Sequence, residues 1–284
     1  MSERKIRVAL PGTDTSYDIV VGTTLRHAAR DIARRWSQAR TFVITDATVA
    51  QLHARSFVAA LGSGRRDVHL LSFPAGERYK VRATRDRLED GLLARGVERG
   101  SLIVALGGGV VGDMAGFVAA SVLRGIAFVQ VPTTLLAQVD ASVGGKVAID
   151  HPRGKNLLGA FHQPRRVYID PSVLATLSEE QYVSGLAEIV KIAAVRDHAF
   201  FAQLEKDAAR LLRRQRSALA AAIERSCRLK AAIVAADERE AGDPDEAHRQ
   251  LRVLEQHRET DDEGRDDERE RQHRLAGRRS RVHG

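Results

Sequence analysis

The stretch SLIVALGGGVVGD, residues 101–113, decides the fold. Residues 101–106 form an apolar run with the length of a buried strand, and a helical pattern follows over 111–123. Gly107, Gly109 and Gly112 match the pattern G-x-G-x-x-G. Glycines at such a turn let the backbone approach a pyrophosphate, which the N-terminus of the helix attracts. Alone the match is weak, because a tight strand–helix turn without a ligand explains it equally well.

Short strands alternate with helices on both sides of this turn. We expect strands at 5–10, 17–21, 41–45, 68–73, 101–106 and 127–131, and helices at 24–36, 48–61, 81–95 and 111–123. The stretch 168–177 closes this region. Such alternation favours a mostly parallel sheet with helices on its faces. The sequence therefore predicts an α/β fold whose N-terminal, dinucleotide-binding domain spans 1–177.

The pattern changes twice after this domain. Residues 178–240 are almost entirely helical, with breaks near Asp197 and Gln215, and predict a helical domain at 178–242. In 243–284, 22 of the 42 residues are Asp, Glu or Arg and only seven are hydrophobic. Such a segment buries too little apolar surface to offset its ordering entropy, so we expect a charged, disordered tail. Lys does not occur after Lys230, as a change of reading frame or a foreign tail would produce.

Composition excludes several classes of protein. The chain has 284 residues, 43% of them hydrophobic and 29% charged, and aromatic residues make up only 5%. The net charge of +8 is not concentrated in basic clusters with interleaved aromatics, so we expect an anionic small-molecule substrate and no nucleic acid. No apolar stretch approaches the ~20 residues of a membrane span. With a single cysteine and no signal-peptide pattern, the expected location is the cytoplasm.

An acidic partner for the ribose of a dinucleotide is expected about 20 residues after the glycine turn. No Asp or Glu lies between Asp113 and Asp140. Asp46 ends an earlier expected strand and is placed to take this role instead. The sequence thus indicates a dinucleotide site with a different order of strands.

Two further stretches carry candidate site residues. Residues 132–164 place Asp140, Lys146, Lys155 and Asn156 among glycines, and lysines on such flexible loops suit a substrate with phosphate and carboxylate groups. In GLAEIVKIAAV, residues 185–195, Glu188 and Lys191 share one helix face among apolar neighbours. We expect Glu188 to be buried, and a buried carboxylate must be paired or bound to a metal.

These stretches together resemble one enzyme family. Residues 107–164 are similar, nearly residue for residue, to the central block of the 3-dehydroquinate synthases. AGERYK (75–80), RGIAFVQVPTT (124–134) and AEIVK (187–191) resemble the flanking family patterns, and the resemblance covers about 5 to 242. It implies an N-terminal NAD-binding α/β domain and a C-terminal helical domain that carries the metal, with the active site between them.

The resemblance also implies where ligands bind. For NAD, it implies an adenosine site at Asp46, Glu77, Arg78, Tyr79 and Lys80, and a pyrophosphate site at Gly109, Val110, Val111, Gly112, Asp113, Thr133 and Thr134. Further cofactor positions are Lys146, Lys155, Val173, Leu174, Ala175 and Thr176. The implied substrate and catalytic positions are Arg124, Asp140, Lys146, Asn156 and Lys191. Glu188 matches the carboxylate ligand of a divalent metal, zinc or cobalt.

The implied reaction converts 3-deoxy-arabino-heptulosonate 7-phosphate into 3-dehydroquinate and phosphate, a lyase step of the shikimate pathway towards chorismate and the aromatic amino acids. NAD transiently oxidises a ring hydroxyl, phosphate is eliminated, and the hydride is returned. The metal acts as a Lewis acid. The implied partner is a sugar-phosphate substrate, and a homodimer is typical of the family.

The sequence departs from the family after DERE, residues 237–240. The family continues with an N-x-G-H-x-x-x-G-H type motif and a later histidine, whereas AGDPDEAHRQL (241–251) follows here. The histidines of the charged tail are not expected to replace these ligands, and a catalytic zinc normally needs three protein ligands. The helical domain is therefore expected to be incomplete, with weak metal binding, little or no activity and a tendency to aggregate.

Three alternatives remain open from the sequence. The chain could be another sugar-phosphate cyclase that uses the same NAD cycle on a different heptulose phosphate. It could be a metal-dependent polyol dehydrogenase of related architecture. It could also be a catalytically impaired, NAD-binding remnant, which the missing histidines favour.

Overall fold

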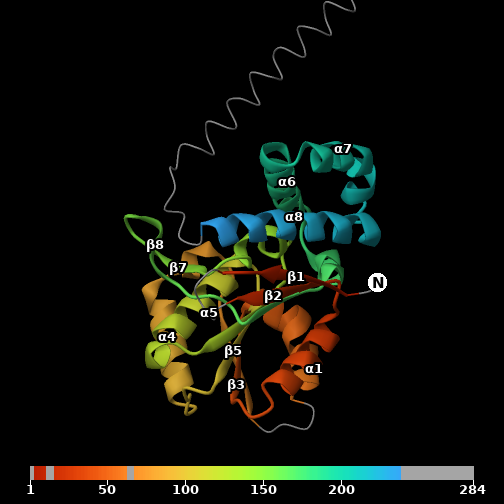
Figure 1. The fold of residues 1–284 in the computed structure, drawn as a ribbon. Helices are drawn as coiled ribbons and strands as arrows, with labels where there is room; N and C mark the ends of the chain where they lie inside the picture. The colour runs from red at the N-terminus through yellow and green to blue at the C-terminus, as the bar shows by residue number, and fades with distance from the viewer. Residues whose placement is uncertain (1–2, 11–15, 63–66, 238–284) are drawn as a thin grey trace, which may run out of the picture.

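The computed structural model describes residues 3–10, 16–62 and 67–237. This part of the chain contains a seven-stranded sheet with the strand order β1-β2-β9-β6-β5-β3-β4 and a separate β7–β8 hairpin (Figure 1). The pairing is parallel throughout the larger sheet except between β1 and β2. The strands are β1 (Arg4–Val8), β2 (Tyr17–Val21), β3 (Thr41–Asp46), β4 (Val68–Phe73), β5 (Leu102–Gly107), β6 (Ala127–Pro132), β7 (Lys146–His151), β8 (Gly154–Phe161) and β9 (Arg166–Ile169).

The helices follow the predicted order. They are α1 (Leu25–Arg35), α2 (Ala47–Val49), α3 (Arg55–Leu61), α4 (Arg82–Leu93), α5 (Gly109–Ser121), α6 (Glu179–Arg196), α7 (His198–Leu212) and α8 (Arg216–Ala236). Short helical turns lie between them, namely η1 (Ala50–Ala54), η2 (Glu77–Tyr79), η3 (Val122–Arg124), η4 (Ala137–Ala141) and η5 (Pro171–Thr176). The predicted α/β class, with a helical C-terminal portion, is confirmed. No helix among the described residues combines the length and apolar character that a membrane crossing requires.

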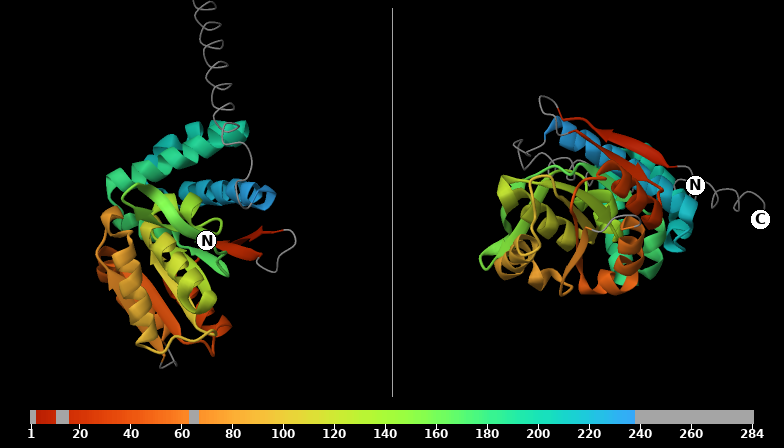
Figure 2. Two further views of the ribbon diagram at one scale, coloured as in Figure 1. Left: turned by 90° about the vertical axis from the view of Figure 1, so that its left-hand side faces the viewer. Right: turned by 90° about the horizontal axis from the view of Figure 1, so that it is seen from below.

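Consecutive side chains of the central strands point to opposite faces of the sheet and so form two layers of the core. Val43 and Val104 face one side of the sheet, where they pack with residues of α1 and α3. Phe42 and Ile103 face the other side and pack with α4 and α5. Figure 2 shows the helices on the two faces of the sheet. Because consecutive side chains of a strand point to opposite faces, near-continuous apolar runs are what such a doubly covered sheet requires.

The helices α6, α7 and α8 pack at the β1–β2 end of the sheet (Figure 1). Tyr17 of β2 and Tyr182 of α6 are fully buried in one hydrophobic cluster with Ile223 of α8. The Tyr182 hydroxyl donates to the carbonyl of Leu211 at 2.7 Å, and the backbone N–H of Gly144 donates to the Tyr17 hydroxyl at 2.8 Å. The helices therefore share a core with the edge of the sheet.

Residues 146–161 form an antiparallel hairpin, so the expectation of flexible loops was wrong. Val147 and Ile149 of β7 are buried in the same cluster as α5, and Gly116 of α5 leaves room for Val147. The strand β8 is largely exposed and lacks an alternating apolar pattern. The glycines of this segment permit close contact between backbones, which the sequence alone does not distinguish from loop flexibility.

The predicted charged tail, 243–284, lies outside the described residues, as do positions 238–242 of the predicted helical domain. Both expectations stay predictions.

Gly185 lets α6 approach the start of η4. A Cβ at this position would lie 2.6 Å from Cβ of Leu135 and 2.9 Å from the backbone nitrogen of Leu136. We predict that Gly185→Val lowers the free energy of unfolding by roughly 1–3 kcal/mol, because the helix must move away from rigid backbone. Urea unfolding measures this change. Gly100→Ala, at a position with open space, should change stability little, and equal losses in the two variants would contradict the account.

His162 connects the hairpin to the sheet and gives stability a pH dependence. Its Nε2 donates to the carbonyl of Ile126 at 2.9 Å, and its ring stacks on Phe128. Burial, aided by Arg165 and opposed by the Ile126 hydrogen bond, lowers the pKa of His162 below its usual 6.5. The imidazole of His162 therefore takes up a proton more readily in the unfolded chain than in the folded chain. The contribution of neutral His162 to the stability of the fold is complete above pH 6.5 and is lost as the pH falls below that value.

We predict that His162→Gln reduces the loss of stability between about pH 7 and pH 5, measured by urea unfolding. His198→Gln, at an exposed position on α7, serves as the control. An unchanged pH dependence in His162→Gln would contradict this assignment.

Candidate functional site

A cleft of about 710 Å³ lies at the carboxyl ends of β3, β5 and β6, beside the N-terminus of α5. Ligands of parallel α/β sheets bind at this end of the strands. We call it the glycine cleft. It is lined by Asp46, Thr48, Val49, Leu52, His53, Ala75, Gly76, Glu77, Lys80, Gly108, Gly109, Val110, Asp113, Thr133, Thr134, Leu136, Thr176, Leu177, Ser178, Glu180, Gln181 and Ser184.

The glycines Gly107, Gly109 and Gly112 of the turn from β5 into α5 differ in what surrounds them. A Cβ on Gly107 would lie 2.5 Å from Cγ2 of Val111, and one on Gly112 would lie 2.7 Å from Oε1 of Gln130. These two glycines allow the tight turn and the packing of α5 on β6. A Cβ on Gly109 would meet only Cβ of Ala141, at 3.5 Å, so the space in front of Gly109 is open to a ligand.

The glycine cleft brings together nine of the residues predicted for the cofactor. These are Asp46, Glu77, Lys80, Gly109, Val110, Asp113, Thr133, Thr134 and Thr176. Nine others do not line it: Arg78, Tyr79, Val111, Gly112, Lys146, Lys155, Val173, Leu174 and Ala175. Val111, Val173 and Leu174 are buried in the core, and Arg78 instead lies over the ring of Tyr79. They shape the segments that carry the lining residues.

Asp46 combines a structural role with its place in the cleft. Its Oδ1 accepts a hydrogen bond from the backbone N–H of Val49 at 2.9 Å, which caps the helix that follows β3. Capping of this kind fixes the direction of the side chain.

His53 lines the cleft but was missed in the sequence. Its Nε2 lies 3.3 Å from Oγ1 of Thr176, whose hydroxyl donates to the carbonyl of Val173 at 2.9 Å. Burial lowers the pKa of His53, against the opposing charge of Asp170. A lone histidine inside a helical pattern carries no distinguishing signal in one sequence.

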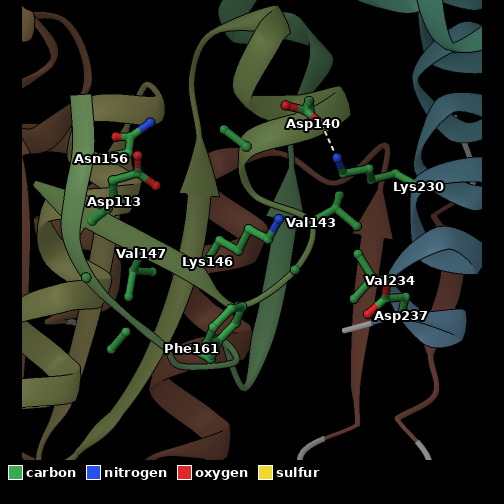
Figure 3. Close-up of a pocket in the computed structure, with 16 residues that line it drawn as sticks. Asp113, Asp140, Val143, Lys146, Val147, Asn156, Phe161, Lys230, Val234 and Asp237 are labelled. Carbon is green, nitrogen blue, oxygen red and sulfur yellow. Dashed lines mark ion pairs between the residues drawn. The ribbon is translucent and has the colours of Figure 1, made fainter. Parts of the chain in front are cut away.

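A second pocket, of about 460 Å³, lies between the β7–β8 hairpin, η4 and α8 (Figure 3). We call it the hairpin pocket. It is lined by Asp113, Asp140, Ala141, Val143, Gly144, Gly145, Lys146, Val147, Ala148, Asn156, Gly159, Ala160, Phe161, Lys230, Val234 and Asp237. Asp113 lines the glycine cleft as well, so the two sites share a wall.

Lys230 is a residue of the hairpin pocket that the sequence reasoning missed. It forms an ion pair with Asp140, with Nζ and Oδ1 2.6 Å apart (Figure 3). Lys230, Val234 and Asp237 follow one another at intervals of four and three residues, so one face of α8 and its C-terminal end supplies all three. This spacing was the feature of the sequence from which a shared helix face that includes Lys230 could have been predicted.

A polar network around the buried Lys80 forms the shared wall. The Lys80 ammonium is 4% exposed, donates to the Asp113 carboxylate, and lies 2.5 Å from Oδ1 of Asn156. Burial raises the pKa of Asp113, although the neighbouring Lys80 opposes this change.

The predicted residues Arg124, Lys155 and Lys191 also line neither site. Arg124 is exposed, with a left-handed backbone at φ 68°. Lys155 is exposed and lies 3.4 Å from Oε1 of Glu77, across the wall. Lys191 is exposed on α6.

Glu188 was expected to be buried, and this was wrong. Its side chain is 21% exposed and pairs with Lys191 at 2.8 Å, because the apolar neighbours Val183 and Val190 are themselves exposed. Among residues 3–10, 16–62 and 67–237, no group of three or more His, Cys, Asp or Glu side chains is placed to hold a metal ion. The donors of this part of the chain therefore do not fit a complete divalent metal site.

Comparison with known proteins identifies the family. Residues 70–184 match the family described as "3-dehydroquinate synthase N-terminal", and residues 185–245 match "3-dehydroquinate synthase C-terminal". The chain is 50% identical over 230 residues to a 3-dehydroquinate synthase of Pelobacter propionicus, which covers 81% of this chain and 64% of the relative. Over 243 residues it is 50% identical to that of Citrifermentans bemidjiense, which covers 85% of this chain and 67% of the relative.

Solved structures show the same architecture. A 2-epi-5-epi-valiolone synthase from Streptomyces hygroscopicus, with NAD+ and Zn2+ bound, superposes with a TM-score of 0.75 at 33% identity, covering 82% of this chain and 65% of that one. A 2-deoxy-scyllo-inosose synthase complexed with carbaglucose-6-phosphate, NAD+ and Co2+ gives 0.71 at 27% identity, covering 86% and 65%.

This chain thus spans about two thirds of the length of its relatives. The sequence match extends through both the N-terminal and the C-terminal family models. The chain belongs to the 3-dehydroquinate synthase family.

Proposed function

We propose that this chain binds NAD in the glycine cleft and 3-deoxy-arabino-heptulosonate 7-phosphate in the hairpin pocket, for the reaction that gives 3-dehydroquinate and phosphate. The observation that carries the proposal is that the two sites share Asp113. A ligand in one site therefore lies next to a ligand in the other, as hydride exchange requires.

The glycine cleft fits NAD in its chemistry. Open space in front of Gly109 and the N-terminus of α5 suit a pyrophosphate. Leu52 and Leu136 are exposed on the lining and offer apolar surface to flat rings. Asp46 and Glu77 supply acceptors for ribose hydroxyls.

The hairpin pocket suits a polar, anionic substrate. Lys146 and Lys230 bring two ammonium groups, and Asp140 holds Lys230 in place through its ion pair. We propose that the lysines neutralise phosphate and carboxylate charge, and that Asn156 orients the ring hydroxyls. When bound, NAD supplies reversible hydride transfer, so none is consumed overall.

The metal requirement favours a second candidate function. Within the described residues, Glu188 is the implied metal ligand, and the donors there do not complete a site. We therefore also propose an NAD-binding protein with impaired turnover. A homodimer and a cytoplasmic location remain predictions, the first testable by sedimentation of the purified chain.

Gly109→Val tests the cofactor site. The Cβ has room in the fold, but the side chain fills the space proposed for the pyrophosphate. We predict that NAD affinity, measured by calorimetry, falls at least about tenfold, since one unfilled phosphate contact costs more than about 1.4 kcal/mol. The melting temperature should change little. Gly100→Val provides the control, and unaltered NAD binding by Gly109→Val would place the cofactor elsewhere.

Phosphate release from 3-deoxy-arabino-heptulosonate 7-phosphate, with NAD and added Zn²⁺ or Co²⁺, tests turnover. We predict a rate far below that of the Pelobacter propionicus relative assayed in parallel, together with weak metal retention on dialysis. A rate equal to the relative's would contradict the weakened metal site. Release from a different heptulose phosphate instead would indicate another cyclase, and steady accumulation of NADH would indicate a polyol dehydrogenase.

A further inference from the structure

We infer that the buried Lys80 ammonium couples the two ligand sites, so that occupation of the glycine cleft sets the position of Asn156 in the hairpin pocket, and the reverse. This inference rests on the proposed function, because it concerns the sites assigned there to NAD and to the sugar phosphate. It assigns Lys80 a positioning role in addition to any contact with the cofactor.

The charge of Lys80 holds three side chains together. The Lys80 side chain is 4% exposed, and its ammonium contacts both the Asp113 carboxylate and Oδ1 of Asn156. A buried ammonium that loses a partner is left without compensation for its lost hydration, which is costly. The three side chains must therefore move together.

The members of this network lie on both sides of the wall between the two sites. Lys80 lines the glycine cleft but not the hairpin pocket, whereas Asn156 lines the hairpin pocket but not the glycine cleft. Asp113 lines both. Figure 3 shows Asp113 and Asn156 next to each other at one side of the hairpin pocket. The network thus crosses from one ligand site to the other through direct contacts.

Backbone hydrogen bonds also join the segment of Lys80 to the hairpin. The N–H of Asp150 donates to the carbonyl of Lys80 at 2.7 Å, and the N–H of Asn156 donates to Oδ1 of Asp150 at 2.9 Å. Asn156 adopts a left-handed conformation, with φ 57°, which asparagine tolerates better than most residues. These bonds hold the hairpin to the segment that contains Lys80. The exposed ion pair of Lys155 and Glu77 joins the same two segments, but an ion pair on the surface contributes little to holding them together.

Coupling of this kind is reciprocal, because each ligand changes the affinity for the other by the same factor. Displacement of the Lys80 side chain by a ligand in the glycine cleft shifts Asn156. A ligand held by Asn156 likewise fixes Lys80.

Crossed binding measurements test the inference. Asn156→Gly removes the side-chain acceptor and still permits positive φ, and NAD is titrated calorimetrically with no second ligand present. We predict NAD binding weakened by roughly fivefold or more, although no atom of Asn156 lines the cleft. Conversely, Lys80→Met should weaken the binding of inorganic phosphate to the NAD-saturated chain by a similar factor. Lys206→Met, at an exposed position on α7, controls for the loss of one positive charge.

The outcomes separate the two proposals. If the wild-type chain binds NAD and phosphate but each variant affects only the site that its own residue lines, the coupling is wrong and the proposed function stands. If the wild-type chain binds no NAD, the proposed function fails and the coupling fails with it. Should Lys80→Met not fold, the Asn156→Gly titration decides alone, since unchanged NAD affinity there overturns the coupling.

Discussion

Gly107 ends β5 so close to α5 that a Cβ there would lie 2.5 Å from the side chain of Val111. This contact fixes where α5 begins, and the start of α5 fixes the rest of the site. It leaves open space before Gly109, sets Asp113 at the wall between the two pockets, and presents Gly116 to Val147 of the hairpin. A larger residue at Gly107 would displace the helix and with it the walls of both pockets.

The central strands were predictable from the sequence. The central strands β3, β4, β5 and β6 lie within a residue or so of their predicted positions, because runs of apolar residues between turn signals have few alternatives. The hairpin was not predictable, since β8 is exposed and its glycines resemble those of a loop. The partial exposure of Glu188 could not be foreseen either, because the nearby apolar side chains of Val183 and Val190 are exposed rather than packed.

Some residues of the two pockets were predictable from the sequence and others were not. Glycines and carboxylates at strand ends reached the cleft because parallel strands bring their carboxyl ends to one edge. Lys230 and His53 were missed because each comes from a helix whose facing side depends on tertiary packing. The segment 173–176 buries Val173 and Leu174 and reaches the cleft only through Thr176. The family resemblance locates a segment, whereas the packing of the folded chain decides which of its side chains faces the cleft.

The most direct test of this account is amide hydrogen–deuterium exchange with and without NAD. The account predicts slower exchange on NAD addition at 107–113 and 76–80, extending through Lys80 to the β7–β8 hairpin. Slower exchange confined to the groove between α7 and α8, around Phe200 and Ala222, would contradict the assignment of the cofactor to the glycine cleft. No change anywhere would contradict NAD binding itself.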